Sequence, residues 1–238
     1  AGATVAWFSA ATLGTALVTT NTYTTPSISV STTYYVESRI GTTCVSATRT
    51  AVIATVNAVP AVPTAGTAGS RCGTGTVIIN ATTPAGITAD WYAAATLGTV
   101  LTGGTGVNSF TTPSITATTN YFAQARNSTT GCISTTRLSV AATVNAAPAV
   151  ATSPVSATRC GTGTVTLSAT AATGTTVDWY DASTAGTRVQ AGTLTGVNSY
   201  VPTVSATTTY YAETRNLTTG CVSATRVAVI ATVNAVPE

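Results

Sequence analysis

The side chains of this chain that could do chemistry are few, and they are mainly arginine and cysteine. Its 238 residues include five Cys, nine Arg, six Asp and Glu, and no His or Lys. A serine or threonine nucleophile needs a neighbouring base, and the two usual bases are missing. Asp178 and Asp181 come closest to a carboxylate pair, but three residues apart on a strand they would lie on opposite faces. We therefore expect no catalytic residue and no enzyme activity.

The low charge of the chain argues against several kinds of partner. Only 6% of the residues are charged and the formal net charge is +3, whereas an ordinary domain is about a quarter charged. A nucleic-acid footprint needs clustered basic residues, and a membrane span needs about 18 uninterrupted apolar residues. This segment has neither. Calcium needs several oxygen ligands, and zinc needs Cys or His at short spacing, so we expect no metal and no cofactor.

The cysteines recur with a fixed separation. Cys72 and Cys132 are 60 positions apart, and Cys160 and Cys221 are 61 apart. This repetition predicts one disulfide within each of two repeats, Cys72 with Cys132 and Cys160 with Cys221, and leaves Cys44 unpaired. Closing a loop of that length stabilises a domain by about 4 kcal/mol in the chain-entropy model. Disulfides indicate an oxidising compartment, outside the cell or in a periplasm; the alternative is free, buried cysteines in a cytosolic domain.

Three similar stretches divide the chain into repeats. Tryptophan recurs in similar phrases at Trp7, Trp91 and Trp179, and Val-Asn-Ala recurs with its asparagine at Asn57, Asn145 and Asn234. The asparagines are 88 and 89 residues apart, which fits one small all-β domain of about 100 residues. We expect an incomplete repeat at 1–58, whose first strands are missing, and further repeats at 59–146 and 147–238. The chain would then be a window from a longer protein.

Short strands separated by turns predict an all-β fold. Residues alternate with a period of two in 164–169, 177–180 and 209–215, and turn residues separate such runs every ~8–12 residues. The abundant threonine loses side-chain freedom in a helix. The linkers at 57–63 and 145–150 contain proline and are therefore stiff. We expect tandem Ig-like Greek-key β-sandwiches arranged as a rod.

Two sets of aromatic residues are expected in the core of these sandwiches. One set comprises the three tryptophans, Trp7, Trp91 and Trp179. The other comprises Tyr34, Tyr121 and Tyr210, each of which ends a phrase with an apolar residue at every second position. Such a phrase is similar to the tyrosine corner of Greek-key sandwiches, in which the ring packs inside.

A third set of side chains is expected to point outward from one sheet. It comprises Tyr92, Phe122, Arg126, Tyr180, Tyr211 and Arg215. Tyrosine and arginine are typical of protein interfaces and of sugar-stacking sites, so this set is a candidate binding face. The alternative is that these residues form cross-strand pairs that stabilise the sheet, with an exposed ion pair between Glu213 and Arg215.

Several phrases together resemble a known family. They are Arg-Cys-Gly-Thr-Gly-Thr-Val at 71–77 and 159–165, Asp-Trp-Tyr at 90–92 and 178–180, Thr-Tyr-Tyr-Ala-Glu at 209–213, and Thr-Thr-Gly-Cys at 129–132 and 218–221. Over its whole length the chain is similar to the CHU_C-associated Ig-like repeat, found in tandem in very large secreted proteins of Bacteroidetes. The first repeat departs from the pattern at Phe8 and in the hairpin 39–44, which is one residue shorter.

The resemblance implies an extracellular, cell-surface stalk or filament segment of a large adhesin. Such adhesins are exported by type IX secretion and include gliding adhesins of the SprB type. The family has no catalytic residues to carry over. The partners implied are neighbouring repeats of the same longer chain.

Two other functions stay open. The repeats themselves could bind polysaccharide or cell-surface ligands, or they could be spacers in a secreted polysaccharide-degrading enzyme. Lateral self-association is also open, because low charge weakens mutual repulsion.

Overall fold

The structure is a computed structural model that describes residues 2–238. Every regular element in this range is a β-strand, which confirms the all-β prediction. Among the described residues there is no helix of the length and hydropathy needed to cross a membrane.

The third repeat is a sandwich of two sheets. One sheet has the order β12 (Thr152–Val155), β15 (Leu167–Ala171), β18 (Gly196–Tyr200). The other has the order β13 (Ala157–Cys160), β21 (Val227–Asn234), β20 (Thr208–Asn216), β16 (Thr175–Tyr180), β17 (Arg188–Gln190). A short ribbon of β14 (Gly163–Thr164) and β19 (Thr203–Val204) completes the unit. The period-two pattern points Leu167, Ala169 and Trp179 into the core between the sheets.

The second repeat has the same plan with fewer strands. One sheet is β5 (Thr64–Ala65), β7 (Ile78–Thr82), β9 (Ser109–Thr111). The other is β6 (Ser70–Cys72), β11 (Leu138–Asn145), β10 (Thr119–Asn127), β8 (Ile87–Tyr92). Ile79, Trp91 and Val140 meet in its core.

The first repeat consists of one sheet. Its strands are β1 (Thr4–Phe8), β2 (Thr32–Ile40), β3 (Cys44–Val45) and β4 (Thr50–Ala54), with β2 between β1 and β4. Because no second sheet covers it within the described residues, Trp7 is half-buried, whereas Trp91 and Trp179 are fully buried. Val52 is likewise 40% exposed.

Each repeat contains an aromatic triplet, which packs in the core of the second and third repeats. The triplets are Trp7, Tyr23 and Tyr34; Trp91, Phe110 and Tyr121; and Trp179, Tyr200 and Tyr210. In each triplet, the last tyrosine (Tyr34, Tyr121 or Tyr210) packs edge-on against the middle ring. Tyr34 and Tyr121 are buried and Tyr210 is half-buried. Such edge-on contacts add to the area buried, and the middle ring was not predicted from the sequence.

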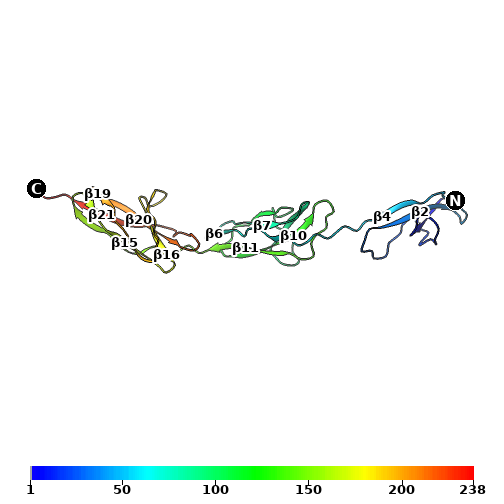
Figure 1. Ribbon diagram of the computed structural model, residues 1–238, viewed down its shortest axis with the longest axis horizontal. Helices are drawn as coiled ribbons and strands as arrows, with labels where there is room; N and C mark the ends of the chain where they lie inside the picture. Colours follow the sequence, from blue (N-terminus) through cyan, green and yellow to red (C-terminus); the bar gives the residue numbers. More distant parts are fainter. Residues whose placement is uncertain (1) are drawn as a thin grey trace.

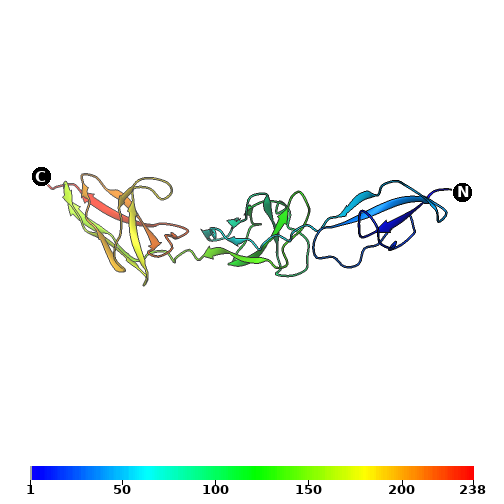
Figure 2. The same cartoon turned by 45° about the vertical axis from the view of Figure 1, so that its right-hand side comes forward.

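The three repeats lie end to end, with the N- and C-termini at opposite ends of the molecule (Figure 1). In each complete repeat the strand that carries the first cysteine runs parallel to the last strand: β6 along β11, and β13 along β21. The last strand runs toward the next repeat, so these cysteines lie at that end. The view in Figure 2 shows β6 directed at the third repeat and the β20–β21 hairpin directed back at β6.

Candidate functional site

A disulfide joins the second repeat to the third. Cys72 ends β6, Cys221 follows β20, and their Cα atoms are 5.5 Å apart. We call this bond the inter-repeat disulfide. The prediction that Cys72 pairs with Cys132, and Cys160 with Cys221, inside their own repeats is therefore wrong. Cys132, Cys160 and Cys44 are free thiols.

The parallel pairing of β6 with β11 explains why the bond does not form inside a repeat. The register places Cys72 beside Asn145, at the end of the last strand, whereas the Cys132 carbonyl accepts from Asn127, at the far end of β10. Since β11 has 8 residues, at about 3.3 Å per residue the two cysteines are at least about 25 Å apart. A disulfide needs Cα atoms within about 7 Å. The first cysteine of a repeat therefore faces the next repeat, and the second faces the previous one.

A turn braced by arginine holds Cys72 in place. Gly73 and Gly75 have φ of +66° and +148°, a region that side chains with a Cβ rarely adopt. The Gly73 N–H donates to the Asn145 carbonyl at 2.9 Å. The Arg71 guanidinium donates to two backbone carbonyls of the turn, at 3.1 and 3.2 Å. The phrase Arg-Cys-Gly-Thr-Gly is thus a rigid mount for the thiol.

A closed hairpin end presents Cys221 to this mount. The Asn216 side-chain oxygen accepts from the backbone N–H groups of Thr218 and Thr219 at 2.9 and 2.8 Å. The Asn216 N–H donates to the Cys221 carbonyl at 2.7 Å, and Gly220 has φ of +73°. An asparagine that bonds backbone two and three residues on stabilises such a turn. Cys221 is only 1% exposed.

The linker before the third repeat is itself fixed to that repeat. The Thr214 hydroxyl donates to the carbonyl of Ala149, and Ala151 is buried. The junction between the second and third repeats is therefore held by a docked linker and a covalent bond.

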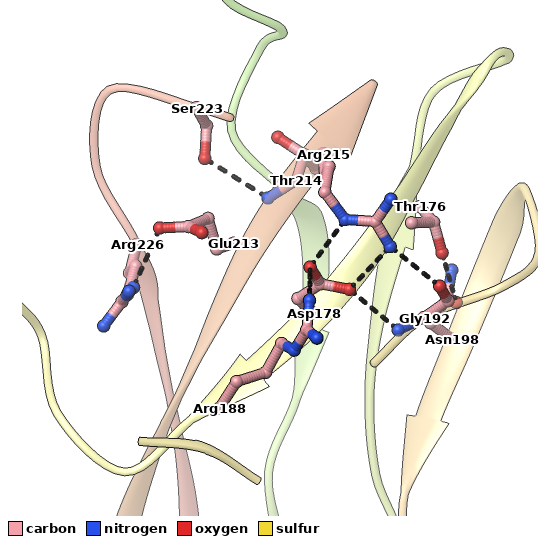
Figure 3. A network of polar contacts seen from close by, with 10 residues as sticks. All are labelled: Thr176, Asp178, Arg188, Gly192, Asn198, Glu213, Thr214, Arg215, Ser223 and Arg226. Carbon is pink, nitrogen blue, oxygen red and sulfur yellow. Dashed lines mark hydrogen bonds and ion pairs between the residues drawn. The ribbon is translucent and has the colours of Figure 1, made fainter. Parts of the chain in front are cut away.

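A buried carboxylate on β16 lies at the centre of a network of polar contacts in the third repeat (Figure 3). Asp178 is fully buried and accepts from Arg215 at 2.7 and 3.2 Å, from Arg188 at 3.3 Å and from the Gly192 N–H at 2.8 Å. A buried charge is tolerated when it is paired and hydrogen-bonded. This cluster ties β16, β20 and the loop after β17 together.

The surroundings of Asp178 also set its ionisation. Burial raises the pKa of its carboxyl, but the hydrogen bonds from Arg215 and Gly192 and the charges of Arg215 and Arg188 lower it more. The net pKa lies below the usual value, so the carboxylate stays ionised near neutral pH. It is a fixed structural anion and has no use as a general acid.

The second repeat has a smaller cluster of this kind, and the first repeat lacks the aspartate. In the second repeat, buried Asp90 accepts from Arg126 at 2.6 Å and from the Gly106 N–H at 2.8 Å. In the first repeat, Ala6 takes the position opposite Glu37 that Asp178 takes opposite Glu213.

An arginine covers one aromatic ring in every repeat. The pairs are Arg49 over Phe8 at 3.3 Å, Arg137 over Tyr92 at 3.3 Å and Arg226 over Tyr180 at 3.4 Å. Each of these arginines also donates to two carbonyls of the loop after the ring. Each further bonds a side chain on the neighbouring strand, Glu37, Gln124 or Glu213. A cation over an aromatic face stabilises a fold by about 0.5–2 kcal/mol.

The candidate binding face is therefore not a free surface. Tyr92 is only 7% exposed, and Tyr180 is half-buried beneath an arginine. Phe122 and Tyr211 are half-buried and lie opposite these two rings. Arg126 and Arg215 are paired with the buried aspartates. The expected ion pair between Glu213 and Arg215 is also wrong, because Glu213 pairs with Arg226 at 2.9 Å.

Two hollows beside these arginines offer little to a ligand. One of about 490 Å³ lies next to Arg49, and one of about 380 Å³ lies next to Arg137. In both, the guanidinium is already bonded to backbone and side-chain oxygens. Within residues 2–238 there is no group of three or more His, Cys, Asp or Glu that could hold a metal ion.

Comparison with known families matches the chain in three consecutive segments, 1–57, 60–145 and 146–235, to the "Ig-like domain CHU_C associated". The chain belongs to this family. Membership and the disulfide indicate an extracellular protein whose Ig-like repeats have neighbouring repeats in a longer chain. No curated protein matches the chain.

Among solved structures, the Ig-like repeats are similar to other tandem domains. Chicken CNTN1 FN1–FN3 domains share 10% identity over 85% of this chain and 75% of that one, with a TM-score of 0.43. Titin domains A168–A170 share 12% over 97% and 88%, with a TM-score of 0.42. The human OSCAR ligand-binding domain shares 14% over 73% and 100%, with a TM-score of 0.31. Likeness at this level concerns the fold and carries no argument about function.

Proposed function

We propose that these Ig-like repeats form a stiff, load-bearing segment of an extracellular stalk or filament, which displays an active part located elsewhere in the parent protein. The observation that carries the proposal is the inter-repeat disulfide between Cys72 and Cys221. A bond between successive domains resists their separation and bending, which a binding module or an enzyme does not need.

A pull on the two ends of the chain would pass through this bond. Its cysteines are 149 positions apart, and the residues between them include every strand from β7 to β20. At about 3.4 Å per extended residue, the bond withholds about 500 Å of chain from the applied load. Only the residues before Cys72 and after Cys221 would carry tension along the main chain.

Single-molecule stretching of the full chain, held at its two ends, tests the proposal. Under oxidising conditions we expect no extension from the residues between Cys72 and Cys221. Reduction should add about 500 Å of contour length. The Cys160→Ser variant is the matched control, because it removes an exposed cysteine that forms no bond and should behave like the original chain. Equal extension with and without reductant would overturn the proposal.

The parent protein is the finer part of the proposal. Family membership supports a cell-surface adhesin exported by type IX secretion, of the gliding-adhesin kind, more than a spacer in a polysaccharide-degrading enzyme. Labelling of intact cells with an antibody raised against this chain tests the location. Surface labelling that disappears in a secretion-deficient strain is the expected result, and label found only in the culture medium would argue for a released enzyme.

A further inference from the structure

We infer that the bond between Cys72 and Cys221 is one member of a regular pattern, in which the first cysteine of every repeat bonds to the second cysteine of the repeat that follows. We call the first cysteine of a repeat, such as Cys72 or Cys160, the strand-end cysteine, and the second, such as Cys132 or Cys221, the hairpin cysteine. On this pattern, Cys160 forms a disulfide with the hairpin cysteine of a following repeat. Cys132 and Cys44 each form a disulfide with the strand-end cysteine of the repeat before their own. The inference rests on the proposed stalk and specifies how its repeats are cross-linked.

The first observation is that Cys160 has the same mount as Cys72. Gly161 and Gly163 have φ of +66° and +155°, close to the values in the bonded turn. The Gly161 N–H donates to the Asn234 carbonyl at 3.0 Å, and the Arg159 guanidinium donates to two turn carbonyls, both at 2.8 Å. Cys160 is exposed. The turn is thus fully built around a thiol that has no partner within residues 2–238.

The second observation is that Cys132 sits in the same hairpin end as Cys221. The Asn127 side-chain oxygen accepts from the N–H groups of Thr129 and Thr130, both at 3.0 Å. The Asn127 N–H donates to the Cys132 carbonyl at 2.8 Å, and Gly131 has φ of +74°. Both halves of the bonded junction therefore exist elsewhere in the chain in unbonded form.

The spacing of the cysteines gives the pattern a mechanical consequence. A hairpin cysteine precedes the next strand-end cysteine by 28 positions, both from Cys44 to Cys72 and from Cys132 to Cys160. Each bond encloses the cysteines of its neighbours, so successive bonds overlap and every repeat is bonded on both sides. From the end of one bond to the start of the next bond that does not overlap it, the main chain of 28 residues reaches at most about 100 Å. A stalk cross-linked in this way would extend little even if a sandwich unfolded.

Formation of each bond is an oxidation of two thiols to a disulfide. The two electrons and two protons pass to the disulfide of an external thiol–disulfide oxidoreductase, which becomes a dithiol. Such oxidants belong to the compartment in which extracellular proteins fold.

The test is the full chain with a fourth repeat, made by joining a second copy of residues 149–238 behind Pro237. The phrase Asn234-Ala-Val-Pro237 then reproduces the natural linker Asn145-Ala-Ala-Pro148. After oxidative folding, thiols are counted by alkylation and mass spectrometry. The chain itself has three free thiols. We expect the extended chain also to have three, because Cys160 takes the new hairpin cysteine.

Two variants of the extended chain separate the possible bonds. With Cys160→Ser at the original position, the new hairpin cysteine loses its partner and four free thiols are expected. A bond within the added repeat would leave two, and no bond in the unsubstituted extended chain would leave five; either count overturns the inference. The control variant Cys132→Ser, which keeps both expected bonds, should have two. Tryptophan fluorescence checks that each variant is folded.

The thiol count and the stretching experiment can fail separately. Expected counts with no protection of the chain from load would refute the stalk and leave the bonding pattern standing. Protection of the chain from load with five free thiols would refute the pattern alone.

Discussion

The two junctions of this molecule have linkers of equal length but are held in different ways. From Asn57 to Pro63, and from Asn145 to Ala151, the chain advances by six residues to a buried position that precedes the first strand of the next repeat. Among the described residues, only the second junction carries a disulfide, whereas Cys132, which faces the first junction, is a free thiol. Linker length alone therefore does not determine which contacts hold a junction.

The repeats at the two ends of the molecule also differ in how many contacts hold them, and the third repeat has more than the first. The described first repeat is a single sheet with Ala6 opposite Glu37, whereas the third is a sandwich with a paired Asp178 at the equivalent place, opposite Glu213. Within the described residues, the third repeat is thus held by more independent ties than the first. Each tie can be removed by one substitution.

Removal of the inter-repeat disulfide should have the largest effect. In Cys72→Ser the second junction should be held by its docked linker alone, so the distribution of molecular lengths in small-angle X-ray scattering should broaden. The number of free thiols should rise from three to four, because Cys221 cannot reach Cys160 at the other end of its repeat. A new bond between Cys160 and Cys221 would refute the geometry that explains the pairing.

Removal of the buried carboxylate should come next. In Asp178→Ala, Arg215 and Arg188 lose their partner, and the third repeat should lose about 3 kcal/mol of stability. Faster hydrogen exchange in β16 and β20 would report this loss. The control is Asp181→Ala, which removes an exposed carboxylate that accepts one hydrogen bond, from the Thr187 N–H, and should cost about 1 kcal/mol. Equal effects of the two substitutions would contradict the role given to the cluster.

Acid should act on the third repeat through the same group. Because the folded-state pKa of Asp178 is lowered, its contribution to stability is present above the carboxyl pKa of the unfolded chain and is lost as the pH falls through the folded pKa. Protection of the β16 amides from hydrogen exchange, relative to the unfolded chain at the same pH, should therefore fall in acid below the usual carboxyl range. In Asp178→Ala this part of the pH dependence should be absent; if it persists, another group is responsible.

Weakening one arginine–aromatic pair should have the smallest effect. In Arg226→Lys the flat guanidinium over Tyr180 is replaced by a point charge that cannot make the same fork of bonds, at a cost of about 1 kcal/mol. The matched variant is Arg137→Lys, where the neighbouring side chain is the neutral Gln124 instead of Glu213. It should cost less, as measured by urea unfolding. A larger cost in Arg137→Lys would mean that the guanidinium geometry at Glu213 adds nothing beyond a point charge.

Much of the fold could be predicted from the sequence because it depends on local patterns. Period-two alternation and the abundance of threonine predict strands, and the recurring tryptophan and asparagine phrases predict repeats. The burial of Trp91 and Trp179 follows from the same alternation. Residue spacing did not reveal which side chains cover the outward rings, since Arg226 lies 46 positions from Tyr180.

The chain by itself determined that its cysteines recur in equivalent pairs and that its modules are strands joined by turns. Only the tertiary structure decided which cysteines meet. The reason is the parallel pairing of β6 with β11 and of β13 with β21, which carries the first cysteine of a repeat to the end opposite its hairpin. Sequence distance therefore favoured partners inside a repeat, while strand direction placed the thiol of one repeat against the hairpin of the next.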